Sequence, residues 1–270
     1  MTHAVSSRPR SWALIVCSLI LIALSVPTAI DEWRNALLGV DASAAWLAVG
    51  ASTLSAIVGL AFLAWAARLT PTVLSWLAAV GWGTGGALIL AGRGNGFIDL
   101  AVESSNLGDD AVDFVTSVVT GPVVEETAKG IGVLALILAA RKVLDRPAQG
   151  GVLGALVGLG FAWGEDIGYY VSALEDGMSG LWESFLARAL LGAYGHAIFT
   201  GVFGYALAWA VLRARNAIVG FLAAAGGFVG ALALHAQANG VGFLAPEDSW
   251  NLTYGAIEIP VLVVSVVLLV

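Results

Sequence analysis

Charged and histidine side chains occur inside stretches of this sequence that are otherwise apolar. In a lipid bilayer, each such group costs at least about 2.5 kcal/mol, so its presence there indicates a functional site. Four successive apolar stretches carry such groups: Glu125, Glu126 and Lys129 in the first, Glu165 and Asp166 in the second, His196 in the third, and His235 with Asn239 in the fourth. We therefore predict that these four stretches surround one polar site.

The spacing of these residues favours convergence if the stretches are helical. Residues four positions apart share a helical face, so Glu125 lies with Lys129 and His235 lies with Asn239. If successive helices alternate in direction, His196 is about 10 Å from the outer end of its helix, at 1.5 Å per residue. The sequence thus predicts a polar cavity in the outer half of the membrane, open to the extracytoplasmic side.

This set of side chains suits the activation of water. Two histidines and a carboxylate can hold a catalytic zinc ion with an open position for water, and a further carboxylate can accept the proton of that water. We predict Glu165, His196 and His235 as the zinc ligands, Glu125 as general base, Glu126 as a second positioning or ligating carboxylate, Asn239 as a donor to the oxyanion or to a ligand, and Lys129 as the cation that neutralises the acidic pair.

The composition indicates which elements position these groups. Of the 270 residues, 59% are apolar and 11% are charged, against about 25% charged in an ordinary soluble domain. At about 20 residues per crossing, the chain has room for eight or nine transmembrane helices and no extramembrane domain. Apolar stretches run over residues 12–30, 44–67, 72–92, 111–140, 151–173, 189–212, 217–239 and 252–270. We therefore predict an all-α, polytopic membrane bundle of about eight transmembrane helices.

The distribution of positive charge predicts the orientation of the bundle. Eight of the Lys and Arg residues lie in the N-terminal tail and the even-numbered connections, and three lie in the odd-numbered connections. Because cytoplasmic loops collect Lys and Arg, both ends of the chain are expected in the cytoplasm. We expect a multi-pass protein of the cell membrane, with the lipid bilayer around it. The net charge of -7 leaves no basic surface for nucleic acid.

We expect a single integral membrane domain over residues 1–270. Within it, residues 1–110 hold three helices and an acidic outer loop at 94–110 with some short helix, residues 111–240 hold the catalytic core, and residues 241–270 hold the last helix. The fifth stretch contains Gly154, Gly158, Gly160, Gly164 and Gly168. This spacing of small residues lets neighbouring helices approach closely, so the fifth helix is expected at the centre of the bundle.

Taken in order, these motifs resemble those of the PrsW family of intramembrane proteases. The family's EExxK motif, its FxxxE motif, a histidine on the next helix and its HxxxD or HxxxN motif match residues 125–129, 161–165, 196 and 235–239. This chain departs from the family by having Asn239 where some members carry Asp, and Asp166 where Asn is common.

The resemblance implies a bacterial plasma-membrane metalloprotease, related to the CAAX-processing and Abi proteases and containing zinc. It also implies a membrane-anchored substrate, such as an anti-sigma factor, cut on its extracytoplasmic side. For the related CAAX enzymes, a glutamate and histidine mechanism without a metal has also been considered. Activation of water by a metal or by a glutamate therefore stays open at the level of the sequence.

Other functions fit the same residues less well. Buried acids and histidines also suit an ion- or proton-coupled transporter, but carriers of this size more often contain an inverted repeat with broken helices, and we find none. Residues 177–180 (GMSG) match the GxSG signature of rhomboid serine proteases, but a serine and histidine pair would leave the buried acids unexplained. We therefore favour the peptidase.

Three further charged residues have less definite predictions. Glu258 lies near the outer end of the last stretch, where we expect it to reach water. Asp166 points about 100° away from Glu165 around the helix, so pairing and catalysis are both open for it. Arg188, at the outer entrance of the sixth helix, either holds an acid or keeps the helix end at the surface. The sequence carries no signal for the oligomeric state.

Overall fold

The apolar stretches form helices throughout the part of the chain that the structure describes, which excludes residues 1–10, 67–71, 192–193, 247–248 and 270. The structure is a computed structural model, and its described residues contain no strand. The α-helices are α1 (Trp12–Ala36), α2 (Ala42–Ala66), α3 (Val73–Gly81), α4 (Leu88–Glu103), α5 (Asp109–Phe114), α6 (Gly121–Ala140), α7 (Pro147–Ala173), α8 (Gly177–Phe185), α9 (Gly195–Arg213), α10 (Ala217–Leu244) and α11 (Trp250–Leu269). Between them lie the π-helical turns η1 (Trp82–Ala87), η2 (Val115–Thr120) and η4 (Leu186–Leu191), and the 3-10 turn η3 (Leu174–Asp176). The predicted all-α class is confirmed.

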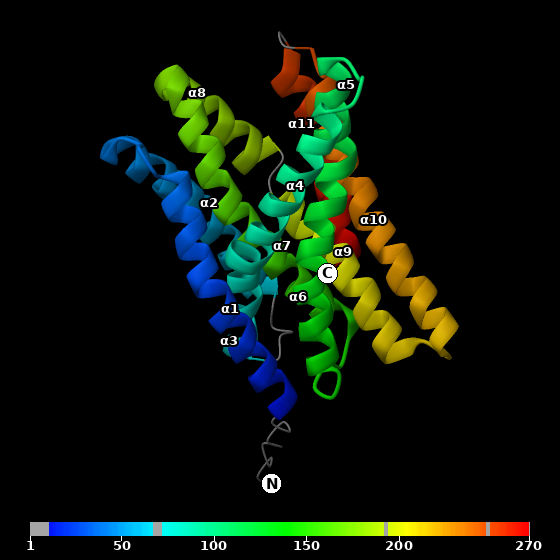
Figure 1. Cartoon of the computed structure of the whole chain (residues 1–270). Helices are drawn as coiled ribbons and strands as arrows, with labels where there is room; N and C mark the ends of the chain where they lie inside the picture. Colours follow the sequence, from blue (N-terminus) through cyan, green and yellow to red (C-terminus); the bar gives the residue numbers. More distant parts are fainter. Residues whose placement is uncertain (1–10, 67–71, 192–193, 247–248, 270) are drawn as a thin grey trace.

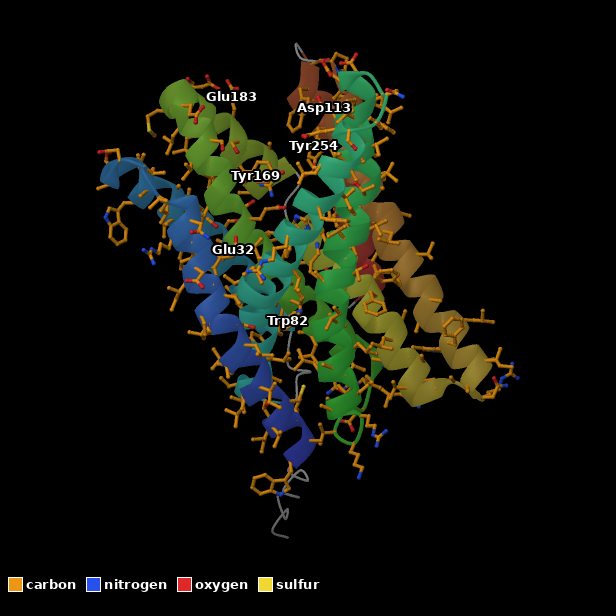
Figure 2. The ribbon with its side chains drawn as sticks, viewed as in Figure 1. Glu32, Trp82, Asp113, Tyr169, Glu183 and Tyr254 are labelled. Carbon is orange, nitrogen blue, oxygen red and sulfur yellow. The ribbon has the colours of Figure 1, made fainter. Side chains whose placement is uncertain are left out.

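The long helices run between two ends of the molecule (Figure 1). At the lower end of the view lie the start of α1 and the α6–α7 and α9–α10 connections, while α8, α5 and the α1–α2 connection lie at the upper end. The lower connections hold Arg141, Lys142, Arg146 and Arg215. Asp113 and Glu183 lie at the upper end (Figure 2). The two ends of the molecule therefore differ in charge.

Five helical stretches of the described chain are long and apolar enough to cross a membrane: Trp12–Ala36, Ala42–Trp65, Val73–Glu103, Pro147–Arg213 and Ala217–Leu244. The stretch Pro147–Arg213 runs from α7 to α9, which pack side by side. Helix α6 has 20 residues but is not among these stretches, because Glu125, Glu126 and Lys129 interrupt its apolar sequence. Helices of this length and composition are those of a multi-pass membrane protein.

The acidic outer loop expected at residues 94–110 is largely helical. Helix α4 continues to Glu103, and α5 begins at Asp109. The prediction allowed only some short helix here because it followed polarity. More of the segment is helical than expected, and no proline interrupts it between Leu88 and Glu103.

Helix α7 lies at the centre of the bundle, as its glycine spacing predicts. Gly150, Gly154 and Gly158 recur every four residues and face α9. A side chain at Gly154 would meet the backbone carbonyl of Thr200, and one at Gly158 would meet that of His196. The backbones of α7 and α9 are therefore in direct contact, which fixes the first turn of α9 against α7.

The turn η1 joins the N-terminal helices to the two helices that carry the acids. Trp82 donates its indole N–H to the carbonyl of Ala128 on α6, with 3.0 Å between nitrogen and oxygen, and lies inside the bundle (Figure 2). Thr84 donates its hydroxyl to the carbonyl of Gly160 on α7 over 2.8 Å. Through these two hydrogen bonds, η1 contacts both α6 and α7.

Candidate active site

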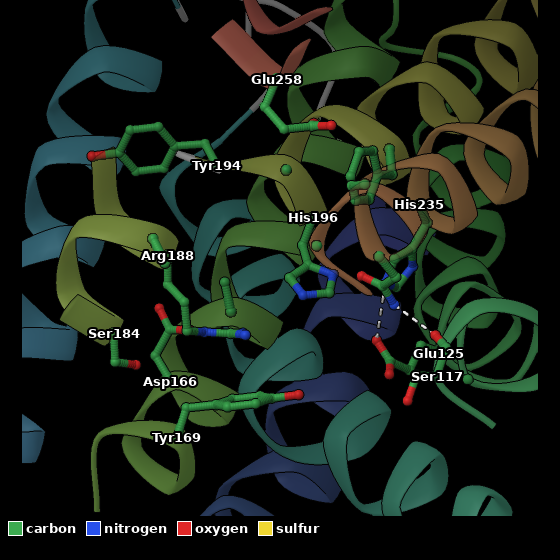
Figure 3. A pocket seen from close by; sticks show the side chains of 18 of the residues that line it. Ser117, Glu125, Asp166, Tyr169, Ser184, Arg188, Tyr194, His196, His235 and Glu258 are labelled. Atoms are coloured by element: carbon green, nitrogen blue, oxygen red, sulfur yellow. Dashed lines mark hydrogen bonds and ion pairs between the residues drawn. The ribbon is translucent and has the colours of Figure 1, made fainter. Parts of the chain in front are cut away.

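A cavity of about 670 Å³ lies among α2, α6, α7, η4, α9, α10 and α11 (Figure 3). Its lining includes the predicted site residues Glu125, His196, His235 and Asn239, together with Asp166 and Arg188. The lining also extends to Asp99 near the end of α4 and to Trp250 at the start of α11. Four of the seven predicted site residues therefore line one cavity, from α6, α9 and α10. The other three, Glu126, Lys129 and Glu165, are not lining residues but contact those that are.

Helix α6 supplies two acids and the cation that they share. Lys129 is fully buried, with 0% of its side chain exposed, and its Nζ lies 2.7 Å from Oε1 of Glu126 and 3.7 Å from Oε2 of Glu125. The ammonium also lies 4.2 Å from the centre of the Phe161 ring on α7. Glu126 accepts a further hydrogen bond over 3.0 Å from the hydroxyl of Thr200. The carboxylate of Glu126 is thus held by several donors, as the predicted positioning role requires.

His235 on α10 has one ring nitrogen bound and the other directed towards an acid. Its Nδ1 lies 3.0 Å from Oε1 of Glu126. Because a carboxylate only accepts hydrogen bonds, Nδ1 of the neutral ring carries the hydrogen and Nε2 keeps its lone pair. That Nε2 lies 3.7 Å from Oε2 of Glu125. A histidine backed by a carboxylate in this way is typical of metal ligands.

His196, in the first turn of α9, has partners at both ring nitrogens. Nε2 lies 3.1 Å from Oε2 of Glu165, and Nδ1 lies 2.8 Å from Nζ of Lys129. The ammonium can only donate, so Nδ1 is the acceptor and Nε2 carries the hydrogen. The His196 and His235 rings are perpendicular, with 4.9 Å between their centres. The two imidazoles therefore lie side by side at the cavity wall.

The predicted ligand Glu165 is held by an arginine. Arg188 of η4 donates from Nη2 to Glu165 and from Nε to Asp166, and its Cζ lies 3.7 Å from the centre of the Tyr169 ring. Of the two roles considered for Arg188, the structure thus shows that it holds acids, and Asp166 is ion-paired. Arg188 fixes Glu165, and Glu165 in turn contacts His196.

Asn239 lies one turn beyond His235 and contacts a π-helical turn. Its Nδ2 donates to the carbonyl of Ser117 in η2 over 2.8 Å. π-helical turns break the regular hydrogen-bond pattern and are frequent at functional sites. An amide nitrogen carries two hydrogens, so this bond leaves one donor of Asn239, a residue of the cavity lining.

The donor set at this corner of the cavity fits a metal ion. One ligand atom each from Glu125, His196 and His235 lies within 4.8 Å of the others. Oε2 of Glu125 is buried and has no hydrogen-bond partner among the described residues, so one strong acceptor is left for another ligand. Two imidazoles and a carboxylate are a common ligand set for zinc. The sequence predicted Glu165, His196 and His235 as the metal ligands. The structure groups the same two histidines with Glu125 instead of Glu165.

Glu258 departs from its sequence prediction. It is only 6% exposed and lines the cavity from α11. Gln237 Nε2 donates to its Oε1 over 2.6 Å, so the expectation that Glu258 reaches bulk water was wrong. The sequence signal for a buried role of Glu258 was its position as an ionisable residue in an apolar stretch. Its partner Gln237 lies on α10, and no sequence spacing links these two residues.

The rhomboid-like segment lies away from the cavity lining. Ser179 is exposed on α8, and its hydroxyl donates to the carbonyl of Asp176. Ser179 is not among the residues that line the cavity with His235.

Comparison with known proteins agrees with this geometry. The family model for PrsW family intramembrane metalloproteases matches residues 71–270. No curated protein and no solved structure matches the chain. The matched range contains the whole cluster of acids, histidines and Lys129, and a metalloprotease family implies a metal ion. The protein is therefore a membrane-embedded protease, and the chain belongs to the PrsW family of intramembrane metalloproteases.

Proposed function

We propose that this protease hydrolyses a peptide bond of a membrane-anchored protein at the cavity wall formed by Glu125, His196 and His235. The observation that carries this proposal is the convergence of these three side chains, from α6, α9 and α10, within 4.8 Å of one another. The family resemblance points to a single-span substrate of the anti-sigma-factor type. A cavity bordered by several helices gives an extended peptide room to lie beside these groups.

We assign the metal to Glu125, His196 and His235, with zinc as the ion that this donor set favours. When bound, the metal would make a coordinated water more acidic and polarise the scissile carbonyl. His235 offers Nε2 directly, since its Nδ1 is bonded to Glu126. His196 offers Nδ1 once the Lys129 ammonium withdraws from it, because Nε2 is bonded to Glu165. Glu165, predicted as a ligand, acts in this proposal by orienting His196.

The remaining steps fall to the side chains of the chain itself. A carboxylate has two oxygens, so one oxygen of Glu125 would hold the metal while the other accepts the proton of the attacking water and returns it to the amide nitrogen of the leaving chain as the C–N bond breaks. Glu126 is occupied by Thr200, His235 and Lys129, so it orients His235 rather than moving protons. The second amide hydrogen of Asn239 stabilises the oxyanion.

We further propose eight crossings, with both ends of the chain in the cytoplasm. The helices α1, α2, α3–α4, α5–α6, α7, α9, α10 and α11 follow the eight predicted stretches. The basic α6–α7 and α9–α10 connections lie at one end of the molecule (Figure 1), which supports that end as cytoplasmic. The cavity lining includes Trp250, near the opposite end. This supports cleavage on the extracytoplasmic side.

The test is cleavage of single-span substrates by the purified protein in proteoliposomes of known orientation. We expect Glu125→Gln and His235→Ala to abolish cleavage while the protein stays helical and monodisperse. Glu183→Gln, the same change at an exposed residue of α8 outside the cavity lining, should cleave at the wild-type rate. Wild-type cleavage by Glu125→Gln would refute the assignment of the site.

Two further readouts separate the parts of the proposal. Mass spectrometry of the products locates the cut bond, and a cut on the side of the α6–α7 connection would refute the sidedness. A chelator should stop cleavage and added zinc should restore it. Cleavage that persists in a metal-free, chelated preparation would replace the metal with a glutamate-activated water.

A further inference from the structure

One face of α11 presents two aromatic rings and an acid to the cavity. Trp250, Tyr254 and Glu258 follow each other at intervals of four residues, so they share a helical face, and all three line the cavity. Glu258 is among the residues seen at the cavity in Figure 3. We call these three residues the α11 face. The catalytic roles assigned above use none of them.

The α11 face is held in a defined conformation. The Trp250 and Tyr254 rings are stacked, with 4.7 Å between centres and 10° between planes. The Trp250 indole donates to the carbonyl of Gly242 on α10 over 2.8 Å. Glu258 is held by Gln237 Nε2 at 2.6 Å. The surface is therefore arranged in advance of any ligand.

The polar groups of this face are incompletely satisfied. Gln237 gives its N–H to Glu258, but its own Oε1 is buried and has no donor among the described residues. Glu258 has no ion pair with a Lys or Arg side chain of the described chain. Buried acceptors without donors are costly in a membrane-embedded site. Two acceptors on neighbouring helices thus lack a cation between them.

The cationic side chains at this site are already engaged. Arg188 is bound to Glu165 and Asp166, and Lys129 is bound to Glu125 and Glu126. Neither can reach Glu258 without giving up a buried partner, which is strongly unfavourable. Among the described residues, neither Lys129 nor Arg188 thus supplies a cation for Glu258, and a bound ligand could supply one.

We propose that the α11 face, with Gln237, is a subsite for a cationic side chain, lysine or arginine, of the substrate segment beside the scissile bond. An ammonium or guanidinium group in the cavity can donate to the carboxyl group of Glu258, which Gln237 orients from α10, and charge-assisted bonds of this kind are the strong ones. The aromatic faces of Trp250 and Tyr254 favour the same cation. This inference rests on the proposed function, because it identifies part of the substrate of that site.

Binding tests the subsite without requiring cleavage. The probes are dye-labelled single-span peptides of about 30 residues, each with one lysine placed in turn at positions across the outer half of the span. A matched series carries glutamine at the same positions. Affinity is measured on the full chain in nanodiscs, with Glu125→Gln added so that no peptide is cut. We expect one register in which lysine binds about tenfold more tightly than glutamine.

Variants of the acid then assign the preference to the α11 face. In the same background, Glu258→Gln should reduce the lysine preference to about onefold, and Glu258→Lys should reverse it in favour of a glutamate peptide. Gln237→Leu should weaken the preference while leaving the acid in place. Glu183→Gln, an exposed acid of α8 outside the cavity lining, should keep the full preference.

The outcomes distinguish this inference from the proposed function. If the lysine peptides bind no more tightly than the glutamine peptides at any position to the chain that retains Glu258, the subsite is refuted. This test does not depend on whether a Glu258 variant folds. If lysine binds more tightly but Glu258→Gln keeps the preference, the α11 face is also refuted as its source. If peptides bind with the expected preference but the wild-type chain cuts none of them, the subsite stands and the proposed reaction fails.

Discussion

Replacing Lys129 with methionine should strongly destabilise the fold. The side chain nearly keeps its length and loses its charge, while the two acids of α6 that contact it stay in place. Lys129 is 0% exposed, so water cannot replace the ammonium, and its Nζ is 2.7 Å from Glu126 and 3.7 Å from Glu125. The variant leaves buried carboxylates without their cation.

The distances set the size of the effect. At an effective dielectric constant of about 20, Coulomb's law gives an attraction of about 6 kcal/mol across 2.7 Å and about 4.5 kcal/mol across 3.7 Å. The cost of burying the ammonium offsets much of this attraction. Removing one partner of a buried ion pair costs about 3–5 kcal/mol, and we expect a loss in that range for Lys129→Met.

The assay is reversible unfolding in mixed micelles, followed by far-ultraviolet circular dichroism. The control is the double variant Lys129→Met with Glu126→Gln, which removes both charges of the shorter pair. It should be more stable than Lys129→Met by about 2 kcal/mol or more, because replacing both partners is far less costly than stranding one. A single variant within about 0.5 kcal/mol of wild type, or a double variant no more stable than the single one, would refute this account of Lys129.

Three further predictions concern packing, positioning and metal content. Gly158→Ala should lower the free energy of unfolding by about 1–3 kcal/mol, because its methyl group meets the backbone of His196. Gly168→Ala, where the added atom meets nothing within 4 Å, should not destabilise the protein; equal losses in thermal unfolding would contradict the close α7–α9 contact. Arg188→Lys keeps the charge but loses the guanidinium group that donates to Glu165 and Asp166 together, so kcat/KM should fall about tenfold. Kinetics equal to wild type would show that Glu165 does not need Arg188 to hold it in position. Elemental analysis of the purified protein should give metal bound to the wild type, with strong depletion in His235→Ala, and equal metal content in both would exclude His235 as a ligand.

The composition of the chain was enough to predict the all-α class, and the sequence pattern was enough to select candidate site residues. An acid or imidazole in a long apolar stretch is a rare pattern with a high energetic cost, so Glu125, His196 and His235 could be selected without coordinates. The four-residue intervals from Glu125 to Lys129 and from His235 to Asn239 indicated which side chains share a helical face. The glycine spacing of α7 placed that helix at the centre for the same reason, since small residues at regular intervals have few other uses in lipid.

The pairing of the charged groups could not be predicted in this way. Between Glu165 and Arg188 lie the end of α7, η3 and α8. Arg188 itself is in η4, and no periodicity rule fixes the direction in which a π-helical turn presents its side chain. The choice between Glu125 and Glu165 in the metal grouping depends on distances within a few ångströms, which the sequence does not carry. Glu258 was expected to reach water because it lies near the end of an apolar stretch, but the Gln237 contact across α10 and α11 buries it.

The contact between α7 and α9 also limits how this protein can change over time. At Gly154 and Gly158 every substituent larger than hydrogen meets the neighbouring backbone, so we expect few substitutions to be tolerated along this contact. The lipid-facing positions of α10, such as Phe221 and Val229, are exposed and accept many apolar residues. We therefore expect sequence change to accumulate at exposed positions such as these, rather than along the α7–α9 contact behind His196.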